Sequence, residues 1–449
     1  MLKNTLQTSL KQRHILMIAI GSAIGTGLFL ASGQSIELTG PSIVLAYLIG
    51  GIMMYIVIRA LGEMSVYEPS IGSFSFYANK YLGNYAGFIS GWNYWFNYII
   101  VSMLELTAST IFLDYWHLTL PHWLSAFILL CIFVVINLFA VSIFGEFEFW
   151  LAGIKVVTIL ALIIFGIYLI FFSHQQFAAN SNIRNLWEYG GFFGGGAFGF
   201  LSAFVIVVFS FGGTELVGIA AGEAENPQKT IPLAINGIIF RILLFYVATL
   251  IIIMCIYPWN KISANVSPFV DVFEKIGITK AATLMNVVVI TAALSSLNSG
   301  IYGTGRMLYN LSTQKNGPKF FSKLGKNNVP YRAILFSLLC IFATVIINYI
   351  WPKDAFMILI DIATVAAIIN WITILITQIA FRIKVGGSHL KYKMPLFPIS
   401  SVIVIGFFIL IIATMTQMPN MSKSILVAPV WIVLLSIGFL IKRSLRSTR

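Results

Sequence analysis

Charged side chains are scarce in this chain. Asp, Glu, Lys and Arg together make up only 10% of its 449 residues, whereas soluble domains usually carry about 25%. So little charge cannot cover the surface of a water-soluble globule of this size. Hydrophobic residues reach 59%, which also excludes intrinsic disorder, because disordered chains have low hydrophobicity. The composition therefore predicts a polytopic membrane protein.

Cysteines and catalytic motifs are scarce as well. The three cysteines, Cys131, Cys255 and Cys340, lie inside apolar runs and form no CxxC pair, so buried inert thiols are favoured over a metal or redox site. The five histidines are dispersed without metal-ligand spacing, and the sequence contains neither a GxSxG elbow nor a P-loop. The sequence therefore predicts no enzyme, no cofactor and no bound metal.

Long apolar runs are plentiful instead. A helix needs about 20 residues to cross the hydrocarbon core, and apolar runs bounded by Gly, Pro and charge predict twelve spans in one transmembrane domain, 1–449. The expected spans are 14–33, 40–61, 85–112, 123–143, 149–172, 197–221, 233–257, 281–308, 331–350, 355–381, 396–418 and 424–441. The first run continues into further spans, so we expect a retained helix and not a cleaved signal peptide.

Basic residues are distributed unevenly between the loops. The net charge is +13, and most Lys and Arg fall in segments that are cytoplasmic if both termini are cytoplasmic. Two clusters lie at 315–332 and 382–393, and a third lies in the tail at 442–449. The positive-inside rule therefore predicts a multi-pass membrane protein with both termini in the cytoplasm. The positive charge is assigned to topology and to contact with membrane lipids, and no nucleic acid is expected as a partner.

Two expected spans contain glycine clusters at their centres, at 21–27 and 212–213. Unwound backbone persists in a membrane only where protein or a water-filled cavity surrounds it. Close helix packing through the GxxxG pair Gly21 and Gly25 is the alternative interpretation. Breaks in spans one and six, the equivalent places of two five-helix halves, favour a secondary transporter with inverted repeats and a site at the midplane.

An unwound segment offers its backbone to a ligand. At Gly25, Thr26 and Gly27 the freed N–H groups begin a second half-helix, whose positive end suits a carboxylate. Freed carbonyls of the first half-helix and of span six, near Phe209 to Gly212, suit an ammonium group. A site with amides on one side and carbonyls on the other fits an α-amino acid.

Three ionisable side chains, Glu105, Lys155 and Glu215, lie deep in apolar runs. Each would cost at least about 2.5–3.5 kcal/mol if it faced lipid at the midplane, so we expect all three to face the interior. They either form buried ion pairs that fix helix packing or relay a coupling proton, since a buried lysine can exchange a proton near neutral pH. Asn298, in the middle of span eight, is expected either to hydrogen-bond a neighbouring helix or to contribute to the substrate pocket.

These features occur together in a known family. The sequence resembles the amino acid transporter family of the amino acid–polyamine–organocation superfamily, and it is most similar to proline-type and aromatic amino acid permeases. The resemblance covers nearly the whole chain. It rests on LKQRH at 10–14 before GSAIGTGLF at 21–29, RALGEM at 59–64, FEFW at 147–150 with Lys155, FSFGGTE at 209–215 through Pro227 and Pro232, and Asn298-Ser299 with RMLY at 306–309.

The resemblance implies an all-α membrane protein of the LeuT type. Twelve helices would include two inverted five-helix repeats, 14–172 and 197–381, with helices one and six broken, and two further helices in 396–441. The implied substrate-binding residues are Ala23, Ile24, Gly25, Thr26, Gly27, Phe209, Ser210, Gly212 and Asn298.

The resemblance also assigns roles within that set. Thr26 and Gly27 would hold the substrate carboxylate, nearby carbonyls would hold its amino group, and Phe209 would be a gating aromatic. Lys155 would occupy the place of a sodium site in sodium-coupled relatives, which implies coupling to protons, with Glu105 and Glu215 completing the relay.

The implied function is import of an amino acid across the inner (plasma) membrane by proton symport, with a neutral, proline-like or aromatic substrate. Permeases for histidine, alanine/glycine/D-serine or GABA and a proton-independent exchanger remain alternatives. A channel or an amino acid sensor is the hypothesis from another class. The expected partners are the amino acid, protons and membrane lipids, and the expected state is a monomer or weak oligomer.

Overall fold

The computed structural model describes residues 13, 16–17, 24–70, 72–117, 120–137, 141–173, 181–264, 266–325, 329–418, 421 and 424–447. The elements in these ranges are helices. This agrees with the all-α membrane class expected from the apolar runs and from the family resemblance.

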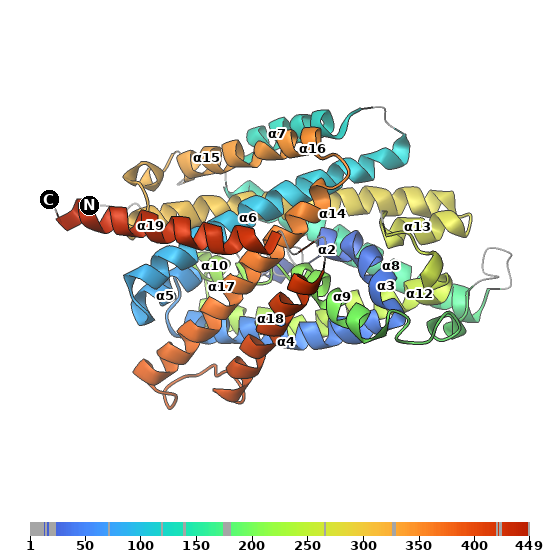
Figure 1. Ribbon diagram of the computed structural model, residues 1–449, viewed down its shortest axis with the longest axis horizontal. Coiled ribbons are helices and arrows are strands. Elements are labelled where there is room, and N and C mark those ends of the chain that lie inside the picture. The colour runs from blue at the N-terminus through green and yellow to red at the C-terminus, as the bar shows by residue number, and fades with distance from the viewer. Residues whose placement is uncertain are drawn as a thin grey trace.

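Two long helices lie at the centre of the molecule. α6 (Asn84–Leu113) packs along α14 (Thr279–Thr313), and it also packs against α17 (Ala355–Val385). In Figure 1 these helices cross the middle of the molecule, with α7 (His122–Asn137), α15 (Tyr331–Ile341) and α16 (Ala343–Ile350) on one side. A large buried apolar cluster joins the helices, so the centre of α6 is shielded from the surroundings.

The remaining helices surround this centre. Their bounds are α4 (Ile43–Tyr67), α8 (Val141–Phe171), α11 (Pro227–Arg241), the π-helical segment η6 (Ile242–Ala248), α12 (Thr249–Ile256), α18 (Ile399–Gln417) and α19 (Val427–Ser447). Short 3-10 turns occur at Gly40–Ser42, Asp114–Trp116, Ile183–Leu186, Ala221–Glu223, Trp259–Lys261, Lys319–Ser322 and Ser424–Leu426. Large apolar side chains are exposed along α8, α18 and α19, as is typical of surfaces that face lipid tails.

Nine helical segments of the described chain are long and apolar enough to cross a membrane. One of them, Ala31–Tyr67, combines the end of the first expected span with the second. Two shorter apolar helices, His122–Asn137 and Gly196–Ser210, lie at the expected spans four and six. A membrane-spanning helical protein is therefore confirmed.

Two short helices were not expected from the sequence. α5 (Ser73–Tyr81) packs against α6, and α13 (Pro268–Lys275) packs against α14. On α13 the side chains of Phe269, Val272 and Phe273 are buried. These helices cover the long central pair and do not lengthen any span.

Within the described residues, regular helix is interrupted beside both of the glycine clusters. After a bend at residues 24–25, α2 (Thr26–Phe29) begins, and a turn at Leu30 leads into α3 (Ala31–Thr39). α9 (Gly196–Ser210) ends in a turn at 211–215 before the short α10 (Leu216–Ala220). Gly213 has φ +99°, a backbone conformation that favours glycine. α2 packs against α9, so the two breaks lie side by side.

Candidate functional site

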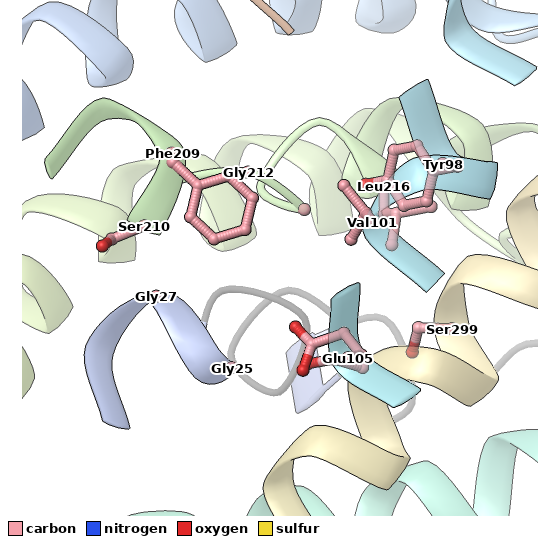
Figure 2. Close-up of a pocket in the computed structure, with 12 residues that line it drawn as sticks. Gly25, Gly27, Tyr98, Val101, Glu105, Phe209, Ser210, Gly212, Leu216 and Ser299 are labelled. Atoms are coloured by element: carbon pink, nitrogen blue, oxygen red, sulfur yellow. The ribbon is translucent and has the colours of Figure 1, made fainter. Parts of the chain in front are cut away.

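A small cavity lies where the two breaks meet α6 and α14. Its volume is about 30 Å³, which is room for about two water molecules. Figure 2 shows α2 on one side, the end of α9 on another, and side chains of α6 and α14 completing the wall. The lining residues are Gly25, Gly27, Tyr98, Val101, Glu105, Phe209, Ser210, Gly212, Gly213, Leu216, Ser296 and Ser299.

Two glycines of the first break allow this close assembly. A Cβ atom at Gly27 would lie 2.5 Å from the Cα of Ser210, and one at Gly25 would lie 2.8 Å from a carboxylate oxygen of Glu105. A Cβ at Gly25 would also lie 2.7 Å from the Ser296 hydroxyl. These distances are too short for real Cβ contacts, so glycine lets the backbone of α2 reach α9, α6 and α14.

Most of the predicted substrate residues lie at this cavity. Gly25, Gly27, Phe209, Ser210 and Gly212 line it. Two others, Ile24 and Thr26, are buried beside it without being among its lining residues. Ala23 lies outside the described residues.

Asn298 is buried and bonded to a neighbouring helix. Its side-chain oxygen accepts a hydrogen bond of 3.1 Å from the amide of Asn137 on α7. Ser296 and Ser299, from the adjacent turn of α14, are the residues of this segment that line the cavity. Of the two roles considered for Asn298, the interhelical bond is therefore the one seen.

Several backbone carbonyl groups at the second break and in the helical turn before it accept hydrogen bonds from within the protein. The Gly212 N–H donates to the Phe209 carbonyl at 2.8 Å, and the Tyr246 hydroxyl donates to the Ser210 carbonyl at 3.1 Å. The Ser210 hydroxyl donates to the Ile206 carbonyl at 3.0 Å. These carbonyl oxygens therefore already accept bonds that hold the turn and the end of α9.

Apolar side chains form the wall opposite the glycines. Tyr98 and Val101 come from α6 and Leu216 from the start of α10, and Figure 2 shows them together on one side of the cavity. These three residues were not among those predicted for the site. For Tyr98 and Val101, the sequence signal is their spacing from Glu105. Positions three, four and seven residues apart share one helix face, so both side chains lie on the same face of α6 as Glu105.

Lys155 and Glu105 belong to one buried polar cluster. The Lys155 ammonium interacts with the carboxylates of Glu148 and Glu105, and all three side chains are at most 4% exposed. The Lys155 ammonium donates to the Ser295 hydroxyl at 3.0 Å, and that hydroxyl donates to Glu148 at 2.7 Å. Glu105 lines the cavity and lies beside Thr26.

Glu148 was not among the predicted site residues. It lies seven residues before Lys155 on α8, so the two side chains share a helix face. That spacing is the signal that could have identified it, together with the need of a buried lysine for an opposite charge.

Glu215 lies in a different cluster. Its carboxylate accepts a hydrogen bond of 3.0 Å from the Tyr98 hydroxyl and lies near Trp371. It is not among the charges that act on Lys155. The predicted trio is therefore divided, with Glu105 and Lys155 together and Glu215 joined to the cavity wall through Tyr98.

A second ion pair lies at the end of α4. Glu63 is 1% exposed, and its carboxylate pairs with Arg382 at the end of α17. It also accepts hydrogen bonds from the side chain of Gln378 at 2.9 Å and from the Met394 backbone at 3.1 Å. This pair joins α4, α17 and the segment before α18.

In the described residues, no group of three or more His, Cys, Asp or Glu side chains could hold a metal.

Long apolar helices, two paired helix breaks and a cavity between them define a helical membrane transporter. Residues 14–448 match the amino acid permease family, and the chain belongs to this family. It is a transporter and not an enzyme.

Similar proteins cover the chain almost from end to end. The aromatic amino acid transport protein AroP of Escherichia coli O157:H7 is 43% identical over 439 residues, which are 97% of this chain and 96% of AroP. The amino-acid permease AapA of Bacillus subtilis (strain 168) is 44% identical over 434 residues, which are 96% of this chain and 94% of AapA. The amino acid permease YtnA of the same strain is 43% identical over 436 residues, with the same two shares.

Proposed function

We propose that this permease imports a neutral amino acid, preferably an aromatic one, across the inner membrane by proton symport. The observation that carries the proposal is the cavity itself, where the backbone of a helix break, an apolar wall and a buried carboxyl group meet. Similarity to an aromatic amino acid transport protein supports the aromatic preference. The basic loops support an orientation with both termini in the cytoplasm.

The proposed architecture is the twelve-helix LeuT type with two inverted repeats. The bend at residues 24–25 and the turn at 211–215 support it, because paired broken helices mark the substrate site in such transporters. In this architecture α2 and the end of α9 belong to corresponding helices of the two halves.

The substrate would lie across the cavity. Backbone N–H groups from Gly25 to Gly27 would hold its carboxylate, and the turn after Phe209 would hold its ammonium group. Its side chain would lie against Tyr98, Val101 and Leu216, where an aromatic ring gains offset or edge contacts. A cavity of about 30 Å³ is too small for an amino acid, so the lining must move apart for binding.

The coupling proton would be held by the cluster that contains Lys155 and Glu105. A carboxyl group at the cavity can respond both to the substrate and to the proton supply. Buried ionisable groups inside a membrane are expensive and mark proton relays. Glu215, joined to the wall through Tyr98, would be a second group that senses occupancy.

Purified protein in proteoliposomes tests this function. Labelled phenylalanine should accumulate under an inward proton gradient, accumulation should collapse with a protonophore, and replacing sodium with choline should change nothing. Competition by each of the twenty amino acids then ranks the substrates. Accumulation that requires sodium would refute proton symport, and counterflow that proceeds equally without a gradient and never becomes concentrative would identify an exchanger. Competition by proline and not by aromatic amino acids would refute the aromatic preference.

A further inference from the structure

The polar cluster behind the cavity contains an acidic group, Glu148, that was not in the predicted relay. Glu148 and Lys155 lie on α8, Ser295 on α14 and Glu105 on α6. Two hydrogen bonds join Lys155 to Glu148 through the Ser295 hydroxyl, at 3.0 and 2.7 Å. These bonds hold Glu148 beside Lys155, whose ammonium group also interacts electrostatically with the cavity residue Glu105.

Few other charges act on this cluster. Among the described residues, the Lys155 ammonium group interacts electrostatically with the carboxyl groups of Glu148 and Glu105. α12 and η6 also pack against α8, and residues 242–256 contain no Asp, Glu, Lys, Arg or His. The titratable groups there are Tyr246, whose hydroxyl bonds the Ser210 carbonyl, and Cys255. Within the part of the chain that the structure describes, the charge balance of the cluster is thus set by two carboxyl groups and one ammonium group.

That balance leaves the ionised cluster with one negative charge in excess. Uncompensated charge is costly inside a protein, and uptake of one proton by either carboxyl group makes the cluster neutral. If the cluster contained only Lys155 and Glu105, the ionised pair would already have no net charge, and its charge would not favour the binding of a proton. The third group therefore turns an ion pair into a site for one proton.

Access decides which carboxyl group exchanges that proton. Glu105 lines the cavity (Figure 2) and its Oε2 atom has no hydrogen-bond partner among the described residues. Glu148 is 0% exposed, does not line the cavity, and is tied to Lys155 through Ser295. A proton that arrives through the cavity therefore meets Glu105 first.

We propose that Glu148 is the fixed counter-charge of Lys155, held in place by Ser295, so that Glu105 at the cavity carries the transported proton. Glu148 and Ser295 are then positioning residues, which act through Lys155 and touch no substrate. This inference rests on the proposed proton symport and adds to it the assignment of the proton to one carboxyl group.

Glu148→Gln tests the assignment because it removes the excess charge with little change in shape. Lys155 would then pair with Glu105, which would stay ionised without a proton. Concentrative uptake should fall about tenfold or more, within the range of coupling between two ligands (about 5- to 150-fold). Counterflow should persist and become nearly independent of pH, and proton movement per amino acid, followed with a pH-sensitive dye, should approach zero. Glu148→Asp, which keeps the charge, should retain coupled uptake and its pH profile.

Control variants distinguish a failure of the Glu148 assignment from a failure of the proposed function. Glu274→Gln removes an exposed carboxylate on α13 and should change nothing, and Ser295→Ala should weaken coupling less than Glu148→Gln. If the wild type shows no proton-driven accumulation, the proposed function fails before Glu148 is tested. If the wild type is coupled and Glu148→Gln stays coupled, the assignment is overturned. Equal loss of uptake, counterflow and pH dependence in Glu148→Gln and Glu148→Asp would show a merely structural role and would also overturn it.

Discussion

Gly27 on α2 lies directly against Ser210 at the end of α9. A Cβ atom added at Gly27 would meet the Ser210 Cα at 2.5 Å and its Cβ at 2.9 Å. The two helix breaks therefore touch through backbone, and the width of the cavity between them depends on this contact. The Tyr47 hydroxyl, 3.0 Å from that of Ser210, further fixes the same point.

Gly27→Ala should therefore impair transport strongly. The added methyl group meets backbone that cannot rotate away, and overpacking of this kind costs about 1–3 kcal/mol. The expected outcome is a protein that inserts in the membrane but takes up labelled amino acid at a small fraction of the wild-type rate. Gly406→Ala is the control, because a Cβ on that α18 glycine meets nothing within 4 Å. Equal uptake by the two variants would contradict the role of this contact.

Tyr98→Phe should weaken both binding and stability. The hydroxyl donates to the buried Glu215 carboxylate at 3.0 Å, and hydrogen bonds to charged groups contribute about 1.5–3 kcal/mol. We expect weaker substrate binding in a competition assay and a lower melting temperature in detergent. The control is Tyr85→Phe, which removes a hydrogen bond of 2.8 Å to Ser436 at an exposed position. A Tyr98→Phe variant no different from this control would show that the bond to Glu215 is dispensable.

Glu63→Gln should destabilise the protein more than Glu68→Gln. Glu63 is buried and pairs with Arg382, and removing one partner of a buried pair costs about 3–5 kcal/mol. Glu68 pairs with Lys80, and the two side chains are 35% and 44% exposed. Its hydrogen bond raises the pKa of Lys80, yet exposed pairs contribute only about 0–1 kcal/mol. Thermal unfolding of both variants in detergent measures the difference, and a similar loss in both would refute the ranking.

The long helices could be predicted because each hydrophobic run approaches the thickness of a bilayer. The breaks could be predicted because glycine marks them, as the turn at Gly213 illustrates. α5 and α13 could not be predicted in the same way. Each is nine residues or fewer, so it gives no run of membrane length, and its place depends on packing against α6 or α14.

The side-chain wall of the cavity was harder to predict than its glycines. In a soluble helix the apolar stripe identifies the buried face, but in a membrane both lipid and protein interior are apolar. Nothing local therefore distinguishes Val101, which lines the cavity, from Ile128, which is 44% exposed. Charged residues differ, because a charged side chain is unfavourable in lipid. Glu105 and Lys155 could therefore be expected to face the protein interior, whereas Leu216 could equally have faced lipid.

Lys155→Ala should separate accumulation from exchange. Without the ammonium group, Glu105 and Glu148 would share a buried site without a compensating cation, and both would keep their protons because burial disfavours each carboxylate and the two negative charges would repel each other. A carboxyl group that never releases its proton cannot couple the proton gradient to the substrate. Concentrative uptake in proteoliposomes should therefore be abolished while counterflow of labelled substrate remains. Lys280→Ala, which removes an exposed charge from α14, should accumulate substrate normally. Normal accumulation by Lys155→Ala itself would show that the proton is coupled elsewhere, and Glu215 with Tyr98 would then be the group to test.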